Sequence, residues 1–147
     1  MFSKATEYAL RATIYIAKKS TEEKKISIDE IAKAIDSPQS FTAKILQLLT
    51  KDNKLVSSVR GPNGGFYLTD KAKKLPVRSI LLAMGEDDVL EKCVLGLKRC
   101  NEVQPCPMHA QYKSIKHQLI KLFETKTIRQ LADEIKDGEV YINNKKS

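Results

Sequence analysis

Two short amphipathic segments, separated by a proline, constrain the fold of this chain more than any other feature of its 147 residues. Residues 26–35, ISIDEIAKAI, place apolar side chains at helical spacing, and Ser27 followed by Glu30 has the pattern of a capping box. Ser37 and Pro38 then predict a second helix start, with the serine as N-cap and the proline at the first helical position. This second helix is expected to bury four apolar side chains, Phe41, Ile45, Leu48 and Leu49.

A glycine-rich segment follows the two helices and predicts a β-hairpin. Residues 55–59, LVSSV, and residues 66–68, FYL, have strand composition, and GPNGG at 61–65 predicts the turn between them. A hairpin placed directly after a helix-turn-helix is a wing. The alternatives are an ordinary helical hairpin and, for the glycines, a phosphate loop, although no Gly-Lys-Ser/Thr triplet follows. We therefore predict a mainly α fold with a small β-hairpin wing.

Further helices are expected before and after this winged helix-turn-helix. Residues 4–19 carry an apolar stripe at helical spacing, and residues 76–84 restart a helix behind Pro76. A longer helix follows near the C-terminus, where apolar residues keep a 4-3-4-3 spacing that is typical of a helix packed along another helix. We expect this seam to pair with its copy in a second subunit, the alternative being that it packs onto its own domain. The seam consists of Met108, Tyr112, Ile115, Leu119 and Leu122.

Charge and motif placement predict three regions. Residues 1–80 form a winged helix-turn-helix DNA-binding domain, and residues 81–107 form a cysteine-bearing sensor loop. Residues 108–147 form a dimerisation helix, a short C-terminal helix and a tail. The net charge of +8 is concentrated in the first region, which holds 15 Lys and Arg against 8 Asp and Glu. Such a surface fits double-stranded DNA, although a merely solvated lysine-rich surface has the same composition. The longest apolar run, residues 80–84, is too short to span a bilayer, so we expect a cytoplasmic protein without membrane association.

The second helix of the helix-turn-helix presents a polar face opposite its apolar stripe. Such a helix enters the major groove with its N-terminal residues nearest the bases, where Gln39 can pair with adenine and Ser40 can bond several bases. Arg60, beside the glycine-rich tip of the wing, can enter a narrow minor groove or contact phosphate. A solvated helix face is the alternative for the helix residues. The candidate DNA-contacting residues are Gln39, Ser40, Thr42, Ala43, Lys44, Gln47, Arg60 and Asn63.

All three cysteines lie on one loop. Cys93, Cys100 and Cys106 are separated by six and five residues, and His109 follows three positions after the last. Structural zinc sites usually use paired Cys-x-x-Cys knuckles, and a thioredoxin-like site also needs Cys-x-x-Cys. Three grouped thiolates near an imidazole suit an iron–sulfur cluster better, while three inert thiols are the alternative. A [2Fe–2S] cluster needs four protein ligands, so a fourth ligand other than cysteine is required.

Several segments together resemble the bacterial winged-helix iron–sulfur regulators typified by IscR and NsrR. They are TEYALRATIYIA near the start, SPQSFTAKILQLL, the wing RGPNGGFYLT, the three-cysteine loop and IRQLADEI near the end. The resemblance covers nearly the whole chain, although IscR and NsrR have five residues between the first two cysteines and this chain has six. It implies a homodimeric transcription factor with a long dimerisation helix and cluster ligands at Cys93, Cys100 and Cys106. Some relatives lack a cluster and sense through thiols or partner proteins.

The resemblance also offers two candidates for the fourth ligand. His109 stands at the offset from Cys106 at which IscR carries a ligand histidine. Glu7 stands directly before the sequence YALR, and NsrR-like members place a ligand carboxylate, contributed by the other subunit, before such a stretch. We favour Glu7, because the first segment is more similar to NsrR than to IscR.

We therefore expect a transcriptional repressor that binds an imperfect palindromic operator and responds, through a [2Fe–2S] cluster, to nitric oxide, redox state or iron–sulfur supply. A cluster-free thiol-based redox-sensing regulator is the second hypothesis. An electron-transfer or cluster-carrier protein is the third, although it leaves the helix-turn-helix and the wing unused. An enzyme is not expected, because no nucleophile–base pairing is evident and the two histidines, His109 and His117, lie eight residues apart.

Overall fold

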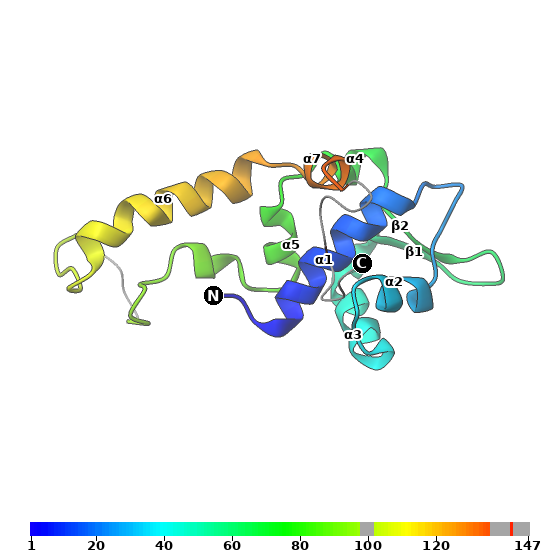
Figure 1. Cartoon of the computed structure of the whole chain (residues 1–147), viewed down its shortest axis with the longest axis horizontal. Helices are drawn as coiled ribbons and strands as arrows, with labels where there is room; N and C mark the ends of the chain where they lie inside the picture. Colours follow the sequence, from blue (N-terminus) through cyan, green and yellow to red (C-terminus); the bar gives the residue numbers. More distant parts are fainter. Residues whose placement is uncertain (98–101, 136–141, 143–147) are drawn as a thin grey trace.

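The computed structural model describes residues 1–97, 102–135 and 142, which form helices and a two-stranded hairpin (Figure 1). The prediction of a mainly α fold with a hairpin wing is confirmed. In chain order the elements are α1 (Lys4–Lys19), α2 (Ile28–Ala34), α3 (Gln39–Leu49), η1 (Lys51–Asn53), β1 (Ser57–Val59), β2 (Gly65–Tyr67), α4 (Asp70–Lys73), α5 (Arg78–Ala83), η2 (Asp87–Leu90), α6 (His109–Thr125) and α7 (Ile128–Asp133).

Helix α1 supplies much of the hydrophobic core and has the bounds predicted from the sequence. Its first turn is capped by Ser3, whose hydroxyl accepts a hydrogen bond from the Thr6 amide at 3.2 Å. Ala9, Ala12 and Ile16 are completely buried. Because two of these side chains are small, α2, α3, α5 and α7 can all pack closely against the helix.

Helices α2 and α3 form the predicted helix-turn-helix, and α2 begins as expected. The Ser27 hydroxyl accepts a hydrogen bond from the Glu30 amide at 3.1 Å. The Glu30 carboxylate is engaged elsewhere, where it accepts a hydrogen bond from the Tyr15 hydroxyl at 2.9 Å. Burial and this contact raise the pKa of Tyr15 to about 12. The contact therefore ties α2 to α1.

The start of α3 differs from the prediction. Pro38 rather than Ser37 occupies the N-cap position, and no side chain caps the helix. The Thr42 hydroxyl lies 2.9 Å from both the Ser37 hydroxyl and the Pro38 carbonyl oxygen. A side chain from within α3 thus holds the first turn, in place of a cap from outside it.

The buried face of α3 is rotated relative to the prediction. Ile45 and Leu49 are buried as expected, and Phe41 packs edge-on against Tyr8 with ring centroids 5.4 Å apart. Leu48 was expected in the core, but 47% of its surface is exposed, so that expectation is wrong. The buried stripe repeats at i, i+3, i+4 and i+7 and consists of Thr42, Ile45, Leu46 and Leu49.

The hairpin that forms the wing is anchored to the chain before α2. Phe66 of β2 exchanges two backbone hydrogen bonds with Ile26, at 2.8 and 2.9 Å. Gly65 is required by this approach, because its φ is +146° and a Cβ there would lie 2.7 Å from the Ile26 carbonyl oxygen. Strand β1 is shorter than predicted, since residues 55–56 are buried in the core instead of pairing in the hairpin.

Helix α6 extends away from the helices around α1 (Figure 1), and none of its residues is buried. Its C-terminal end is fastened to the chain before α5. The Val77 amide donates to the Lys126 carbonyl at 2.9 Å, and the Ile128 amide donates to the Leu75 carbonyl at 3.0 Å. Helix α7 then returns to α1, where Ile128 and Ala132 are buried. No helix in the described ranges is long and apolar enough to cross a membrane.

Candidate functional site

The outer face of α3 is open to solvent along most of its length. Gln39, Ser40, Lys44 and Gln47 are exposed, and Ala43 is partly exposed between them. The helical period places these side chains opposite the stripe that packs on the core. Amide, hydroxyl and ammonium groups can bond base edges and phosphates, and the small Ala43 lets a base edge approach. The face therefore suits insertion into a major groove.

Thr42 does not belong to this face. Its side chain is completely buried, and its hydroxyl lies 2.9 Å from the Pro38 carbonyl oxygen. The rotation of α3 that buries Leu46 and Leu49 turns Thr42 inward with them. The expectation that Thr42 contacts DNA is therefore corrected, since it stabilises the helix that carries the exposed residues.

A groove of about 480 Å³ separates α3 from the wing. Among the residues that line it are Ala43, Gln47, Val59, Arg60 and Gly64. Arg60 and Asn63 are both exposed, at the foot and at the tip of the hairpin turn. When a helix and its wing enter adjacent grooves of DNA, a sugar–phosphate strand passes between them. The position and cationic edge of this groove suit such a strand.

Two of the three cysteines lie side by side near the start of α6. The Sγ atoms of Cys93 and Cys106 are 3.4 Å apart, and both thiols are free. A disulfide would bring the sulfurs to about 2.05 Å. Two thiolates on one tetrahedral metal ion, each at about 2.3 Å, lie about 3.8 Å apart. The distance of the pair lies between these two values, so a small separation of the sulfurs would let both thiolates ligate a common metal. Cys100 lies outside the described residues.

The surroundings of Cys93 favour its thiolate form although the side chain is buried. A hydrogen bond from the Leu95 amide lowers the pKa of the thiol, and a contact with the Cys106 thiol acts in the same direction. The Leu97 amide and the positive charge of Lys116 lower this pKa further. Peptide N–H groups directed at sulfur also stabilise thiolates that ligate iron. The donor set therefore fits an iron–sulfur group.

Helix α6 contacts both arms of the loop that carries the cysteines, namely the arm that leads into Cys93 and the arm that leads into Cys106. The Lys116 ammonium donates to the Glu91 carbonyl oxygen at 3.0 Å, on the arm before Cys93. Lys113, one turn earlier on α6, forms an ion pair with Glu102 on the other arm. The two lysines thus attach α6 to the chain just before Cys93 and to the segment that leads into Cys106.

Arg78 joins the same region to α5. Its side chain is only 16% exposed and forms ion pairs with Glu91 at 3.4 Å and with Glu124 of α6 at 2.6 Å. Burial lowers the pKa of Arg78, but the bonds with the two carboxylates outweigh burial and raise it overall. The guanidinium of Arg78 therefore connects three parts of the chain. It joins α5 both to the segment before Cys93 and to α6, the helix that the sequence predicts to form the dimer.

Glu86 connects the chain leading to the thiols with the start of α1. Its carboxylate accepts hydrogen bonds from the hydroxyls of Ser3 and Thr6, the latter at 2.6 Å. These donors lower the pKa of Glu86. The contact lies beside Glu7, so it links the thiol region to the segment that carries one candidate for the fourth ligand.

The two candidates for a fourth ligand occupy different places. His109 begins α6, and its amide donates to the Cys106 carbonyl at 3.0 Å, so one turn separates it from that thiol. Glu7 is exposed in the first turn of α1. Within residues 1–97, 102–135 and 142, no three His, Cys, Asp or Glu side chains gather closely enough to hold a metal ion. The described chain therefore brings together Cys93 and Cys106, with His109 one turn away.

Sequence reasoning did not single out Lys113, Lys116, Arg78 or Glu86. The two lysines left a weak signal, because they stand three residues apart on a predicted helix. The other two left none. Arg78 reaches a residue 46 positions away, and Glu86 reaches one 80 positions away, so no local pattern marks them.

Known proteins with related sequences are regulators of transcription. A family model described as "Rrf2: Iron-dependent Transcriptional regulator" matches residues 2–134. An Aquifex aeolicus protein assigned to the HTH-type transcriptional regulators is 33% identical over 133 residues, which is 89% of this chain and 90% of the relative. The HTH-type transcriptional regulator NsrR of Oceanobacillus iheyensis is 32% identical over 138 residues, which is 92% of this chain and 90% of the relative.

A solved structure shares the fold. The oxidized form of Staphylococcus aureus CymR matches with a TM-score of 0.67 and 20% identity, and the match covers 92% of this chain and 98% of that chain. The arrangement of a helix-turn-helix, a wing and a long C-terminal helix is therefore common to both proteins.

Proposed function

The chain belongs to the Rrf2 family of transcriptional regulators, and from this premise we propose that it binds operator DNA as a homodimer under the control of a [2Fe–2S] cluster. The DNA-binding part rests on the family and on the exposed face of α3. The observation that carries the cluster part is the thiol pair of Cys93 and Cys106, whose Sγ atoms lie 3.4 Å apart. Regulation of transcription rather than catalysis is the activity of this family.

In this proposal the N-terminal half of α3 reads the major groove. Gln39 and Ser40 meet base edges, with Ala43 against a thymine methyl group. Lys44 and Gln47 lie further along the same face, where they reach bases or phosphates. The wing brings Arg60 and Asn63 to the neighbouring minor groove and its phosphates.

The thiol loop holds the cluster. Cys93, Cys100 and Cys106 supply three thiolates, and the fourth ligand is Glu7, contributed across the dimer, or His109. When bound, a [2Fe–2S] cluster supplies one-electron redox chemistry and reactivity toward nitric oxide. The chain itself directs peptide N–H groups at Cys93 and keeps that side chain out of solvent. These features set the stability of the ligand sphere.

The dimer forms along α6. Met108, Ile115 and Leu122 recur every seventh residue and leave 45%, 51% and 49% of their surfaces exposed. An apolar seam of this period is buried when a second copy packs against it. The two copies of α3, which are the reading helices, then lie about 34–36 Å apart, so that both enter one face of a palindromic operator.

The state of the loop reaches the DNA through α6. Lys113 and Lys116 attach both arms of the loop to this helix, and Arg78 attaches one arm to α5. Loss of cluster ligation releases the arms, which changes the packing of the dimer helix and the separation of the reading helices. Operator affinity then changes with the occupancy of the loop.

A cluster-free thiol regulator is the second candidate. Two free thiols 3.4 Å apart need only a small movement to form a disulfide, and the protein named as an oxidized form of CymR has the same fold. In that case the reversible bond between Cys93 and Cys106 would take the place of the cluster as the switch.

Anaerobic purification separates the two candidates. The first predicts about two iron and two sulfide ions per chain with visible absorption, and loss of both in Cys93→Ala, Cys100→Ala and Cys106→Ala. An iron-free protein whose operator binding responds to peroxide supports the second. The circular-dichroism spectra of Glu7→Ala and His109→Ala then identify the fourth ligand, since only its replacement changes the spectrum of the bound cluster.

A further inference from the structure

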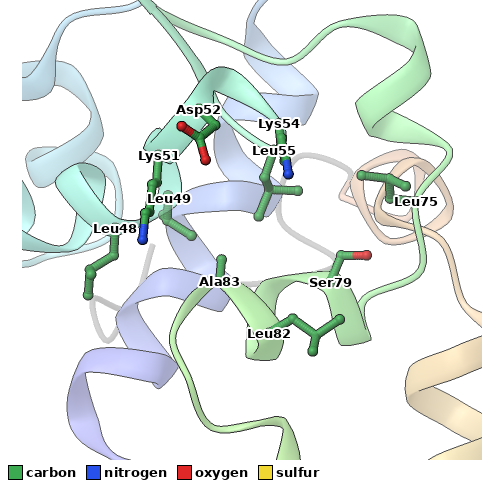
Figure 2. Close-up of a pocket in the computed structure, with 10 residues that line it drawn as sticks. All are labelled: Leu48, Leu49, Lys51, Asp52, Lys54, Leu55, Leu75, Ser79, Leu82 and Ala83. Carbon is green, nitrogen blue, oxygen red and sulfur yellow. The ribbon is translucent and has the colours of Figure 1, made fainter.

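A second groove lies on the far side of α3 from the wing. It has a volume of about 450 Å³ and is bounded by the C-terminal end of α3, the turn of η1 and one face of α5 (Figure 2). Its floor and walls are apolar and include Leu48, Leu49, Leu55, Leu75, Leu82 and Ala83. A volume in this range is large enough to admit several side chains of a partner.

Two leucines stand at the edges of this groove without covering. Leu48 of α3 is 47% exposed and Leu82 of α5 is 58% exposed, and both line the groove, one from each helix (Figure 2). Single exposed leucines are common, but two that line one groove place apolar surface on both of the helices that bound it. Burial of this apolar surface by a partner is favourable, because it removes the surface from water.

The rim of the groove is cationic. Lys51 and Lys54 both line it and are exposed, and with one exposed carboxylate, Asp52, also on the rim, its charged residues carry a net positive charge. Among the residues that the structure describes, neither lysine forms an ion pair. Two ammonium groups beside an apolar floor are therefore open to carboxylates of an incoming chain.

The turn that carries these lysines is held in a defined shape. Asp52 and Asn53 have φ values of 59° and 49°, in the left-handed region that non-glycine residues seldom adopt. The Asn53 side chain stabilises this shape, because its oxygen accepts a hydrogen bond from the Ser58 amide at 3.2 Å. The rim is thus fixed to the base of the wing.

The groove stays accessible when α3 lies on DNA. Its α3 residues, Leu48 and Leu49, come from the last turn of an 11-residue helix, whereas Gln39 and Ser40 lie in the first turn. At about 1.5 Å per residue the two ends of α3 are about 15 Å apart. A partner in the groove therefore does not compete for the major groove.

We propose that this groove docks an amphipathic α-helix of a partner protein, with apolar anchors one turn apart and glutamate or aspartate beside them. Anchors at helical spacing fill the space between Leu48 and Leu82, and the carboxylates pair with Lys51 and Lys54. The groove thereby gives the DNA-bound regulator a contact surface for a protein. This inference does not depend on the cluster, so it stands whichever switch the thiol loop carries.

The test measures the fluorescence anisotropy of a labelled synthetic helix that carries leucines at i, i+3 and i+7 and glutamates on both flanks. Binding should weaken at least about tenfold in Leu82→Ser and in the double variant Lys51→Glu/Lys54→Glu. The charge-matched variant Lys19→Glu/Lys24→Glu, away from the groove, should bind the peptide as the unmodified protein does. Operator affinity and iron content should be unchanged in Leu82→Ser, which separates this test from that of the proposed function.

Three results would overturn the proposal. One is equal binding of a control peptide in which lysines replace the glutamates. Another is unchanged peptide binding by both groove variants while circular dichroism shows that they are folded. The third is dissociation of the dimer by Leu82→Ser in sedimentation, because that assigns the groove to contact between two copies of the chain.

Discussion

The side chains proposed to carry the function of this chain are few, and they differ in how they are held. Cys93 receives N–H groups from its own loop and a positive charge from Lys116 of α6. Glu86 receives hydroxyl donors from the first turn of α1. Arg60, in contrast, projects from the wing into solvent. Its role therefore appears only when DNA is bound.

Replacement of Arg60 by alanine should weaken operator binding by about 1–3 kcal/mol, because in the proposed complex this guanidinium, at the foot of the wing turn, reads the minor groove. The measurement compares operator with random DNA at the same salt concentration. A larger loss on the operator is expected. An equal loss on both duplexes would make Arg60 a phosphate contact.

The contact of Glu86 predicts a pH-dependent stability. Hydrogen bonds from Ser3 and Thr6 lower the pKa of this carboxyl in the folded chain. Its contribution is therefore present above the ordinary pKa of glutamate and is lost as the pH falls through the lower folded value. Urea unfolding should show that Glu86→Gln costs about 1 kcal/mol at pH 7 and progressively less in acid. A constant difference at every pH, or an equal loss in the exposed control Glu23→Gln, would refute the assignment.

At the scale of elements, local patterns predicted which helices exist and in what order. They predicted less well which face of each helix is buried. The bounds of α1 and the cap at Ser27 follow from short-range spacing and hydrogen bonding, which the sequence displays directly. The buried face of α3 follows from how that helix packs on α1. For this reason Thr42, which was expected on the exposed face, is buried, and Leu48, which was expected in the core, is exposed.

The thiol region was predictable only in part for the same reason. The clustering of the cysteines predicted a shared site, and the structure brings the sulfurs of Cys93 and Cys106 to 3.4 Å. The contacts that attach it to the rest of the chain join residues far apart in sequence. They depend on the tertiary arrangement of α1, α5 and α6, to which no local pattern refers.

The attachment of the loop to α6 predicts a local effect of Lys116→Met. Removal of the bond to the Glu91 carbonyl should speed amide hydrogen exchange in residues 91–97 about fivefold, equivalent to about 1 kcal/mol. The measurement uses cluster-free protein, so it reports the chain alone. Lys116→Arg should retain much of the protection, and the exposed control Lys121→Met should retain all of it. Equal exchange in all variants would show that Lys116 does not hold the loop.

At the scale of the whole molecule, the wing and the start of α6 lie at opposite ends (Figure 1). In the proposed function the basic winged helix-turn-helix faces DNA, and the thiol loop lies beside α6, whose apolar residues Met108, Ile115 and Leu122 are exposed. If the loop senses a signal as proposed, the contacts that lead from it to α3 run through α6, α5 and α1. The proposed homodimer along α6 would couple the two α3 helices through one shared interface.

The seam predicts the effect of Ile115→Asp. A charge placed on both copies of α6 at the dimer contact should convert the dimer to monomer in sedimentation and weaken palindrome binding by at least about tenfold. Ile115 is 51% exposed in the single chain, so the fold should persist. An unchanged dimer would place the subunit contact elsewhere.

The central claim is that occupancy of the thiol loop sets the affinity for DNA. The most direct measurement titrates one anaerobic preparation against operator DNA before and after removal of its cluster, at fixed salt, with random DNA as the control. The account predicts at least about a tenfold change in operator affinity and no comparable change on random DNA. Equal operator affinity of the cluster-bound and cluster-free protein would contradict it.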